Sequence, residues 1–104
     1  MRVQINHDDH IRTPHERATQ IEATIRAALG RYAAMITDLE VHLSDDNGLR
    51  FRPGDKRCLI EARIARRTAI AVSDNADSVE RAVYGASGKL ERSIAAIVDR
   101  SRNH

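Results

Sequence analysis

The longest regular pattern in the chain lies in its last third, residues 75–102, where apolar residues recur every three or four positions. That spacing is typical of one face of an α-helix. The apolar positions are Val79, Val83, Ala86, Leu90, Ile94 and Ile97. Asn75 and Asp77 provide capping side chains at the start, and Glu80 follows Asp77 at the spacing of a capping box. The pattern predicts one long helix whose apolar stripe, with Leu90 in its middle, is buried against a flat apolar partner.

Four shorter stretches alternate apolar and polar residues, and they predict the strands of that partner. They are residues 2–6, 37–44, 56–65 and 68–73. Cys58 falls on the apolar side of the third stretch, together with Ile60, Ala62 and Ile64. Arg66 and Arg67 lie between the third and fourth stretches and mark the tip of a hairpin. Because neither residue favours a positive φ, we expect a longer or bulged turn there.

A second helix is predicted between the first and second strands. Thr13 is a capping residue, Pro14 suits the first helical position, and Glu16 completes a capping box. An apolar stripe at helical spacing follows as far as Tyr32. The element order is therefore β-α-β-β-β-α, and we expect residues 1–104 to form a single α+β domain. Its two layers would be a four-stranded, mostly antiparallel sheet and two helices packed on one face of that sheet.

Charge is nearly balanced over the chain, with 17 Lys and Arg against 15 Asp and Glu, but it is unevenly distributed. Residues 36–55 hold two arginines and five acids, whereas residues 56–73 hold five basic residues and one acid, Glu61. A positive segment is a candidate for binding phosphate groups, although a solvated strand face explains the same pattern equally well. Aromatic residues make up only 3% of the chain, so few side chains can stack on bases. Phe51, in the polar loop 45–55, is either a plug at the sheet edge or a stacking residue.

No group of residues makes a positive case for an enzyme. Metal-ligand side chains occur at His7, Asp8, Asp9 and His10, but a polar strand-to-helix connection explains them more simply. Cys58, on the inward face of its strand, is more typical of a small core residue than of a nucleophile. The sequence has no glycine-rich phosphate loop, no CxxC pair and no serine-centred elbow. We therefore expect no catalytic activity, no cofactor and no bound metal.

The N-terminal residues and the cysteine content bear on the cellular location of the protein. Residues 1–8 contain no apolar run, so they match neither a signal peptide nor a membrane span. The single cysteine excludes an internal disulfide and weakly favours a reducing compartment. We therefore expect a cytoplasmic protein.

From the second predicted strand onward, the chain resembles the family of ribosome hibernation-promoting factors and ribosome-associated translation inhibitors. The matching stretches are 36–44, 55–63, 70–72, 78–83 and 89–93, which read ITDLEVHLS, DKRCLIEAR, IAV, SVERAV and KLERS. The first strand, the turn at 9–11 and the first helix fit the same plan, so the resemblance covers nearly the whole chain. The matching motifs are strand and helix patterns rather than a catalytic signature.

The resemblance implies a β-α-β-β-β-α domain that binds the small ribosomal subunit in the channel for tRNA and mRNA. There it would contact ribosomal RNA through basic side chains, exclude tRNA and mRNA, and hold ribosomes idle under starvation or in stationary phase. Because the chain ends at His104 without a further domain, it resembles the short members of the family. No membrane or DNA partner is expected, and the sequence does not indicate a homo-oligomer.

The basic residues expected to contact RNA fall into two groups. The first, in the positive segment, comprises Arg57, Arg63, Arg66 and Arg67, and the second, on the last helix, comprises Lys89, Arg92, Arg100 and Arg102. Short family members have a densely basic end to this helix, whereas here Glu91 and Asp99 offset part of the charge. We therefore predict that the hairpin arginines contribute more to RNA binding than the helix end. The alternative is a divergent paralogue that acts as a protein–protein interaction module, with weak or no ribosome binding.

Overall fold

The computed structural model describes residues 1–8, 15–45 and 55–102. The strands are β1 (Arg2–His7), β2 (Ile36–Asp45), β3 (Lys56–Ile64) and β4 (Ile70–Ala76). The helices are α1 (His15–Leu29) and α2 (Val79–Arg102), and a short 3-10 helix, η1 (Gly30–Tyr32), follows α1. The predicted order β-α-β-β-β-α is confirmed. Three features of the sequence analysis lie outside the described residues. They are the expected helix cap at Thr13, the candidate metal ligands Asp9 and His10, and Phe51.

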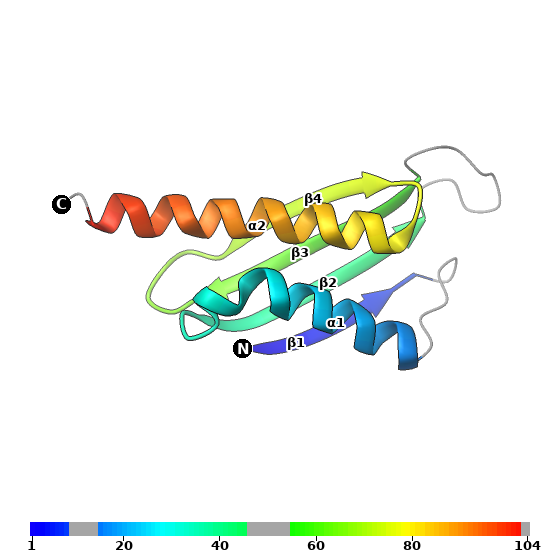
Figure 1. Cartoon of the computed structure of the whole chain (residues 1–104), viewed down its shortest axis with the longest axis horizontal. Coiled ribbons are helices and arrows are strands. Elements are labelled where there is room, and N and C mark those ends of the chain that lie inside the picture. The colour runs from blue at the N-terminus through cyan, green and yellow to red at the C-terminus, as the bar shows by residue number, and fades with distance from the viewer. Residues whose placement is uncertain (9–14, 46–54, 103–104) are drawn as a thin grey trace.

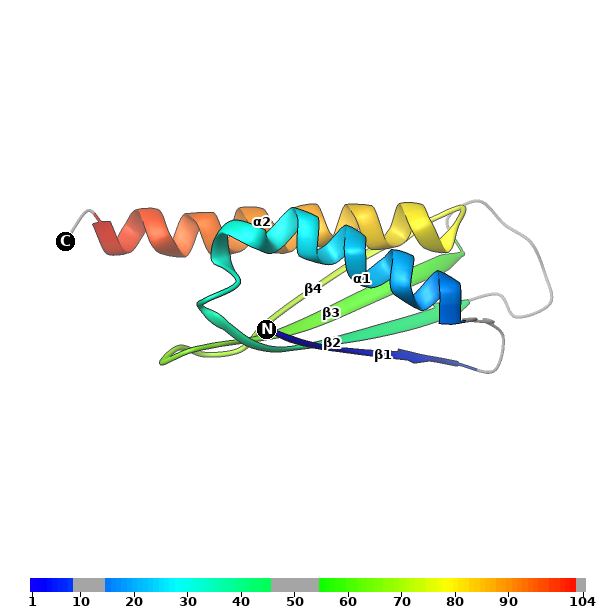
Figure 2. The ribbon, with the colours of Figure 1, turned by 60° about the horizontal axis from the view of Figure 1, so that its bottom comes forward.

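The four strands form one sheet in the order β1-β2-β3-β4. β1 and β2 are parallel because α1 and η1 carry the chain back between them, whereas β2, β3 and β4 are consecutive antiparallel neighbours. Both helices lie on the same face of the sheet, and α2 runs along its length (Figures 1 and 2). The predicted two-layer α+β fold, with a mostly antiparallel sheet, is therefore confirmed.

The core lies between the sheet and the two helices. In β3 the alternate residues Cys58, Ile60, Ala62 and Ile64 are all buried, since successive side chains of a strand point to opposite faces. Leu90 of α2 is fully buried and belongs to the same cluster. The prediction that Leu90 lies in the middle of a buried stripe is confirmed.

Helix α2 begins at Val79, so the predicted start at residue 75 was wrong. Strand β4 instead continues past Asn75, which pairs with Arg57 of β3. The hydroxyl of Ser78 caps the helix, because its oxygen accepts a hydrogen bond from the Arg81 amide at 3.2 Å. A pairing between strands therefore outweighs the capping preference of Asn75.

A glycine allows α2 to lie close to the edge strand β4. A Cβ atom at Gly85 would collide with the carboxylate of Asp74. The Nζ of Lys89 donates to that carboxylate at 3.2 Å and to the backbone carbonyl of Ser73 at 2.8 Å. Lys89 therefore ties the helix to the outer strand of the sheet.

The connection between β3 and β4 is longer than a two-residue hairpin turn, as the sequence predicts. The Arg67 amide donates to the Ile64 carbonyl at 3.1 Å, and β4 starts only at Ile70. Arg66 takes a φ of 64°, a left-handed conformation that is strained for a residue with a side chain. The turn therefore projects the Arg66 side chain from a backbone that would suit glycine better.

Candidate nucleic-acid interface

The face of the sheet that the helices leave uncovered carries charged side chains. The residues of β3 that alternate with the buried ones point to this open face, and Arg57 and Arg63 are both exposed on it. Arg57 lies near the start of β3 and Arg63 near its end. A rise of about 3.3 Å per residue places their Cα atoms roughly 20 Å apart. The two predicted residues therefore serve different parts of the face.

A concavity of about 620 Å³ lies on the open face, at the end of the sheet next to the β3–β4 turn. Its lining includes four arginines, Arg2, Arg63, Arg66 and Arg67. The structure thus brings three of the predicted residues together and adds Arg2, which the sequence analysis missed. Arg2 lies on the polar side of the first alternating stretch, and that position could have indicated that its side chain lies on the open face.

The charges of these arginines are neutralised to different extents. Arg2 Nε lies 3.1 Å from Asp38 Oδ1. Across the described residues, Arg63 and Arg66 form no ion pair. A guanidinium group without an acidic partner can bind a phosphate group through two parallel hydrogen bonds. Arg63 and Arg66 are therefore the side chains of the concavity best suited to that role.

Lys56 belongs to the positive segment but does not add to a phosphate-binding surface. Its Nζ lies 2.9 Å from Asp45 Oδ2 and 3.1 Å from Asp55 Oδ1, and the Asp55 side chain is fully buried. The hydrogen bond that Lys56 donates to Asp45, followed by the one to Asp55, raises the pKa of Lys56. The positive charge counted in residues 56–73 is thus partly cancelled by acids that precede it in the sequence.

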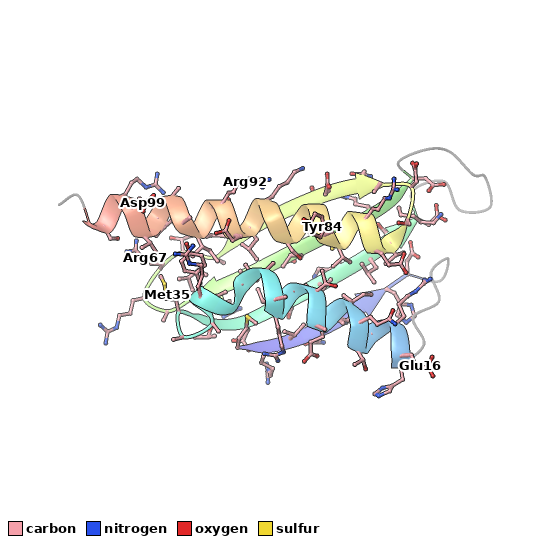
Figure 3. All side chains as sticks on the ribbon, in the orientation of Figure 1. Glu16, Met35, Arg67, Tyr84, Arg92 and Asp99 are labelled. Atoms are coloured by element: carbon pink, nitrogen blue, oxygen red, sulfur yellow. The ribbon has the colours of Figure 1, made fainter. Side chains whose placement is uncertain are left out.

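The hairpin arginines and the end of α2 meet at one end of the molecule. Arg67 donates from a guanidinium nitrogen to the Ser101 hydroxyl at 2.6 Å, and Figure 3 shows Arg67 and Asp99 at that end. Arg100 is exposed on the same last turns of α2, while the side chain of Arg102 lies outside the described part. The hairpin arginines and the end of the last helix, which the sequence analysis assigned to two separate groups of RNA contacts, are therefore neighbours here.

Lys89 and Arg92 lie in the helical layer rather than on the open face. Lys89 is held by Ser73 and Asp74, as described above, and the Arg92 guanidinium lies over Gly88, one turn earlier in α2. Tyr84 is 76% exposed on the same helix, although the sequence analysis did not single it out. The predicted basic side chains that the structure describes therefore do not form one continuous surface.

Cys58 does not offer a nucleophile to this interface. It is fully buried, and burial, with a smaller contribution from the charge of Asp74, raises the pKa of its thiol to about 12. The reactive thiolate is thus scarce at neutral pH. The interpretation of Cys58 as a core residue agrees with this position.

Residues 3–102 match the family model described as sigma 54 modulation protein / S30EA ribosomal protein. The chain belongs to this family of ribosome-associated proteins. The family resemblance predicted from the strand and helix motifs is thereby confirmed. Comparison with curated proteins gives no match.

Two solved structures share the fold of this family member. A ribosomal subunit interface protein from Coxiella burnetii superimposes with a TM-score of 0.76 at 12% identity, covering 95% of this chain and 99% of that one. The N-terminal domain of Protein Y from Thermus thermophilus gives a TM-score of 0.73 at 15% identity, covering 93% and 99%. At these identities the likeness concerns the arrangement of the elements. No helix in the described ranges is long and apolar enough to span a membrane.

Proposed function

We propose that this chain binds the small ribosomal subunit through phosphate groups of ribosomal RNA and inhibits translation by occupying the channel for tRNA and mRNA. The observation that carries the proposal is the pair of exposed arginines, Arg63 and Arg66, which lack ion pairs in the described structure. Membership of a ribosome-associated family supports the choice of RNA as the partner. The similar protein from Coxiella burnetii is named as a ribosomal subunit interface protein, which supports the same place of action.

The proposed inhibition is by occupancy, without a chemical step. The buried Cys58 thiol is mainly protonated at neutral pH because its pKa is raised to about 12. The arginines of the concavity can hold phosphate, but their guanidinium groups have too high a pKa to act as a general base. The proposal therefore predicts that inhibition is proportional to the amount of protein bound. We propose that this inhibition takes place in the cytoplasm and holds ribosomes idle under stress.

Cosedimentation with small subunits on sucrose gradients tests the partner. Binding should weaken steeply as salt rises, because each phosphate contact releases condensed counterions. About four to six contacts correspond to a log–log slope of roughly −3 to −5. Subunits treated with RNase are the control, and the association should be lost with them. Binding that survives both treatments would favour the protein–protein interaction module instead.

A purified translation system tests the place of binding. If the chain occupies the channel, raising the concentrations of initiator tRNA and mRNA together should relieve the inhibition. The Arg63→Ala and Arg66→Ala double variant serves as the matched control, since it should bind and inhibit less without loss of fold. Inhibition that persists at saturating tRNA and mRNA would contradict channel occupancy.

A further inference from the structure

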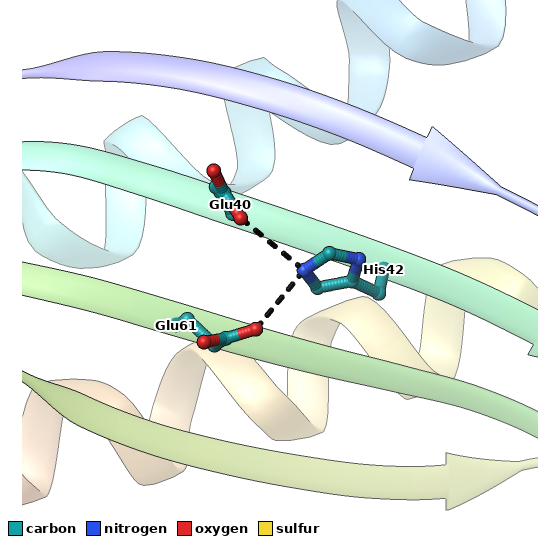
Figure 4. A group of neighbouring side chains, drawn as sticks. All are labelled: Glu40, His42 and Glu61. Carbon is teal, nitrogen blue, oxygen red and sulfur yellow. Dashed lines mark ion pairs between the residues drawn. The ribbon is translucent and has the colours of Figure 1, made fainter.

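Three side chains with metal-ligand chemistry converge on the open face of the sheet. Glu40 and His42 come from β2, two positions apart and therefore on the same face, and Glu61 comes from β3. Glu40 and Glu61 are direct cross-strand partners in the register. Figure 4 shows the imidazole of His42 turned toward both carboxylates. Two paired strands thus hold the three groups in place.

The separations between the three ligand atoms suit a single metal ion. His42 Nε2 lies 3.1 Å from Glu61 Oε1 and 3.6 Å from Glu40 Oε2, and all three atoms lie within 4.8 Å of one another. Ligands about 2.0–2.2 Å from a zinc ion lie roughly 3.0–3.6 Å from each other. Two of the three separations already fall in this range. Small rotations of the Glu40 and Glu61 side chains would bring the third separation, between their carboxylate oxygens, into the same range.

The two carboxylates of the group favour a cation between them. Two carboxylates placed directly opposite each other on neighbouring strands destabilise the pair of strands. Arg2, on the neighbouring strand β1, pairs with Asp38 instead. Arg63, two positions from Glu61 on the same face, is not paired with either glutamate in the described residues. In the described residues, the ion pairs of Glu40 and Glu61 are both with His42.

The nitrogen of His42 that faces the carboxylates also lacks a proper partner. The His42 side chain is 37% exposed, but its Nε2 atom is shielded from solvent and makes no hydrogen bond to any described residue, despite its closeness to both glutamates. Buried polar atoms in folded proteins are nearly always hydrogen-bonded or bound to an ion. A metal ion between the three side chains would satisfy this nitrogen and both carboxylates together.

We propose that Glu40, His42 and Glu61 bind a divalent transition-metal ion, with Zn²⁺ as the representative cation. The imidazole nitrogen disfavours Mg²⁺ and Ca²⁺, which prefer oxygen ligands alone. Three protein ligands leave a fourth position on the solvent side of the open face. Water fills that position, or an oxygen atom of a bound anion takes its place.

The site has a consequence for the concavity described above. Glu40 and Glu61 line that concavity together with Arg63. A dication held between the two glutamates cancels their charge and makes the electrostatic potential around Arg63 more positive. Metal binding is therefore expected to strengthen the hold of the open face on anions. The metal site itself does not depend on the proposed ribosome binding.

Isothermal titration calorimetry of the whole chain with ZnCl₂, and with MgCl₂ in parallel, tests the site. Wild-type protein should bind Zn²⁺ in preference to Mg²⁺. His42→Gln and Glu61→Gln should each lower the Zn²⁺ affinity by at least about tenfold, because even the loss of a group that only supports a ligand costs 10–100-fold. His15→Gln, which removes an exposed histidine from α1, is the matched control and should bind like wild type.

Circular dichroism of each variant without metal checks that the fold is intact, and Glu40→Gln provides a further ligand variant if one of the others unfolds. NMR adds a local readout, since Zn²⁺ should shift the ring signals of His42 and leave those of His15 in place. Absence of Zn²⁺ binding by the wild type, or equal binding by His42→Gln, would overturn the proposal. Perturbation of His15 in place of His42 would do the same.

Discussion

Strand β3 presents two different surfaces, and the two faces of the sheet serve different purposes. Its helix-facing residues are apolar and fully or almost fully buried, from Cys58 to Ile64. The alternate residues on the open face are charged, apart from Leu59. The buried face determines the free energy of unfolding, whereas the open face offers partners to a ligand. Substitutions on the buried face should therefore change mainly the stability, and substitutions on the open face should change mainly the binding.

The largest effect is expected from the buried side. Leu90→Ala should lower the free energy of unfolding by roughly 2–5 kcal/mol, because it removes buried methyl groups and leaves a cavity. The matched control is Leu59→Ala, on the open face, which should cost about 1 kcal/mol or less. Chemical denaturation of both variants gives the comparison. Equal losses would show that the helices do not define the core as described.

The next effect concerns binding and comes from the open face. Replacing Arg63, Arg66 and Arg67 together with Ala should weaken small-subunit binding by at least about tenfold, since one hydrogen bond to a charged group contributes about 1.5–3 kcal/mol. The salt dependence should also become shallower, by roughly 0.7–0.9 in slope for each phosphate group that the variant no longer binds. Cosedimentation at several salt concentrations measures both. The melting temperature should change little, because these side chains are exposed.

A smaller loss of binding is expected from the end of α2. The Arg100→Ala and Arg102→Ala double variant should weaken binding less than the hairpin triple variant, because Asp99 offsets part of the charge there. The same cosedimentation assay ranks the two variants. A greater loss from the helix pair would contradict the hairpin hypothesis. Near-equal losses would fit a single surface in which Arg67 and Ser101 are in contact.

The last effect should appear only at alkaline pH. The unfolded thiol of Cys58 ionises near its ordinary pKa of 9.0, whereas in the folded chain the pKa is raised to about 12. The contribution of the thiol to stability is therefore complete below about pH 9 and is lost as the pH rises toward 12. The raised pKa of Lys56 acts in the same direction. Urea midpoints measured from about pH 8 to about pH 11 should fall less in Cys58→Ala than in wild type.

Local patterns predicted those parts of the fold that depend on one buried face. The alternation in β3 and the helical stripe around Leu90 both reflect burial against a neighbouring layer, so the sequence carries them directly. The start of α2 does not follow from such a pattern. Asn75 has a helix-capping side chain, but its pairing with Arg57 of β3 keeps it in the strand. That pairing links distant parts of the chain, so local preference could not reveal it.

The candidate site was less predictable for the same reason. Counting charges placed Lys56 with the arginines, and only the fold shows it held between Asp45 and Asp55. Glu61 was recognised as the one acid of its segment, but its position opposite Glu40 depends on the register of β2 and β3. Arg63 and Arg66, by contrast, are exposed as their polar positions suggested. Residue type and alternation thus predict which side chains are exposed. Which side chains pair with each other can be known only from the register of the strands.

The contact of Lys89 with the backbone of Ser73 also affects how copies of this chain behave toward each other. β4 is an outer strand of the sheet, and outer strands have backbone groups that can pair with a strand from another molecule. The ammonium of Lys89 donates a hydrogen bond to the backbone carbonyl oxygen of Ser73 in β4, at 2.8 Å, and places a positive charge beside the strand. An incoming strand would have to displace a charged donor before it could pair at that point. We therefore expect Lys89 to protect this side of the sheet against aggregation.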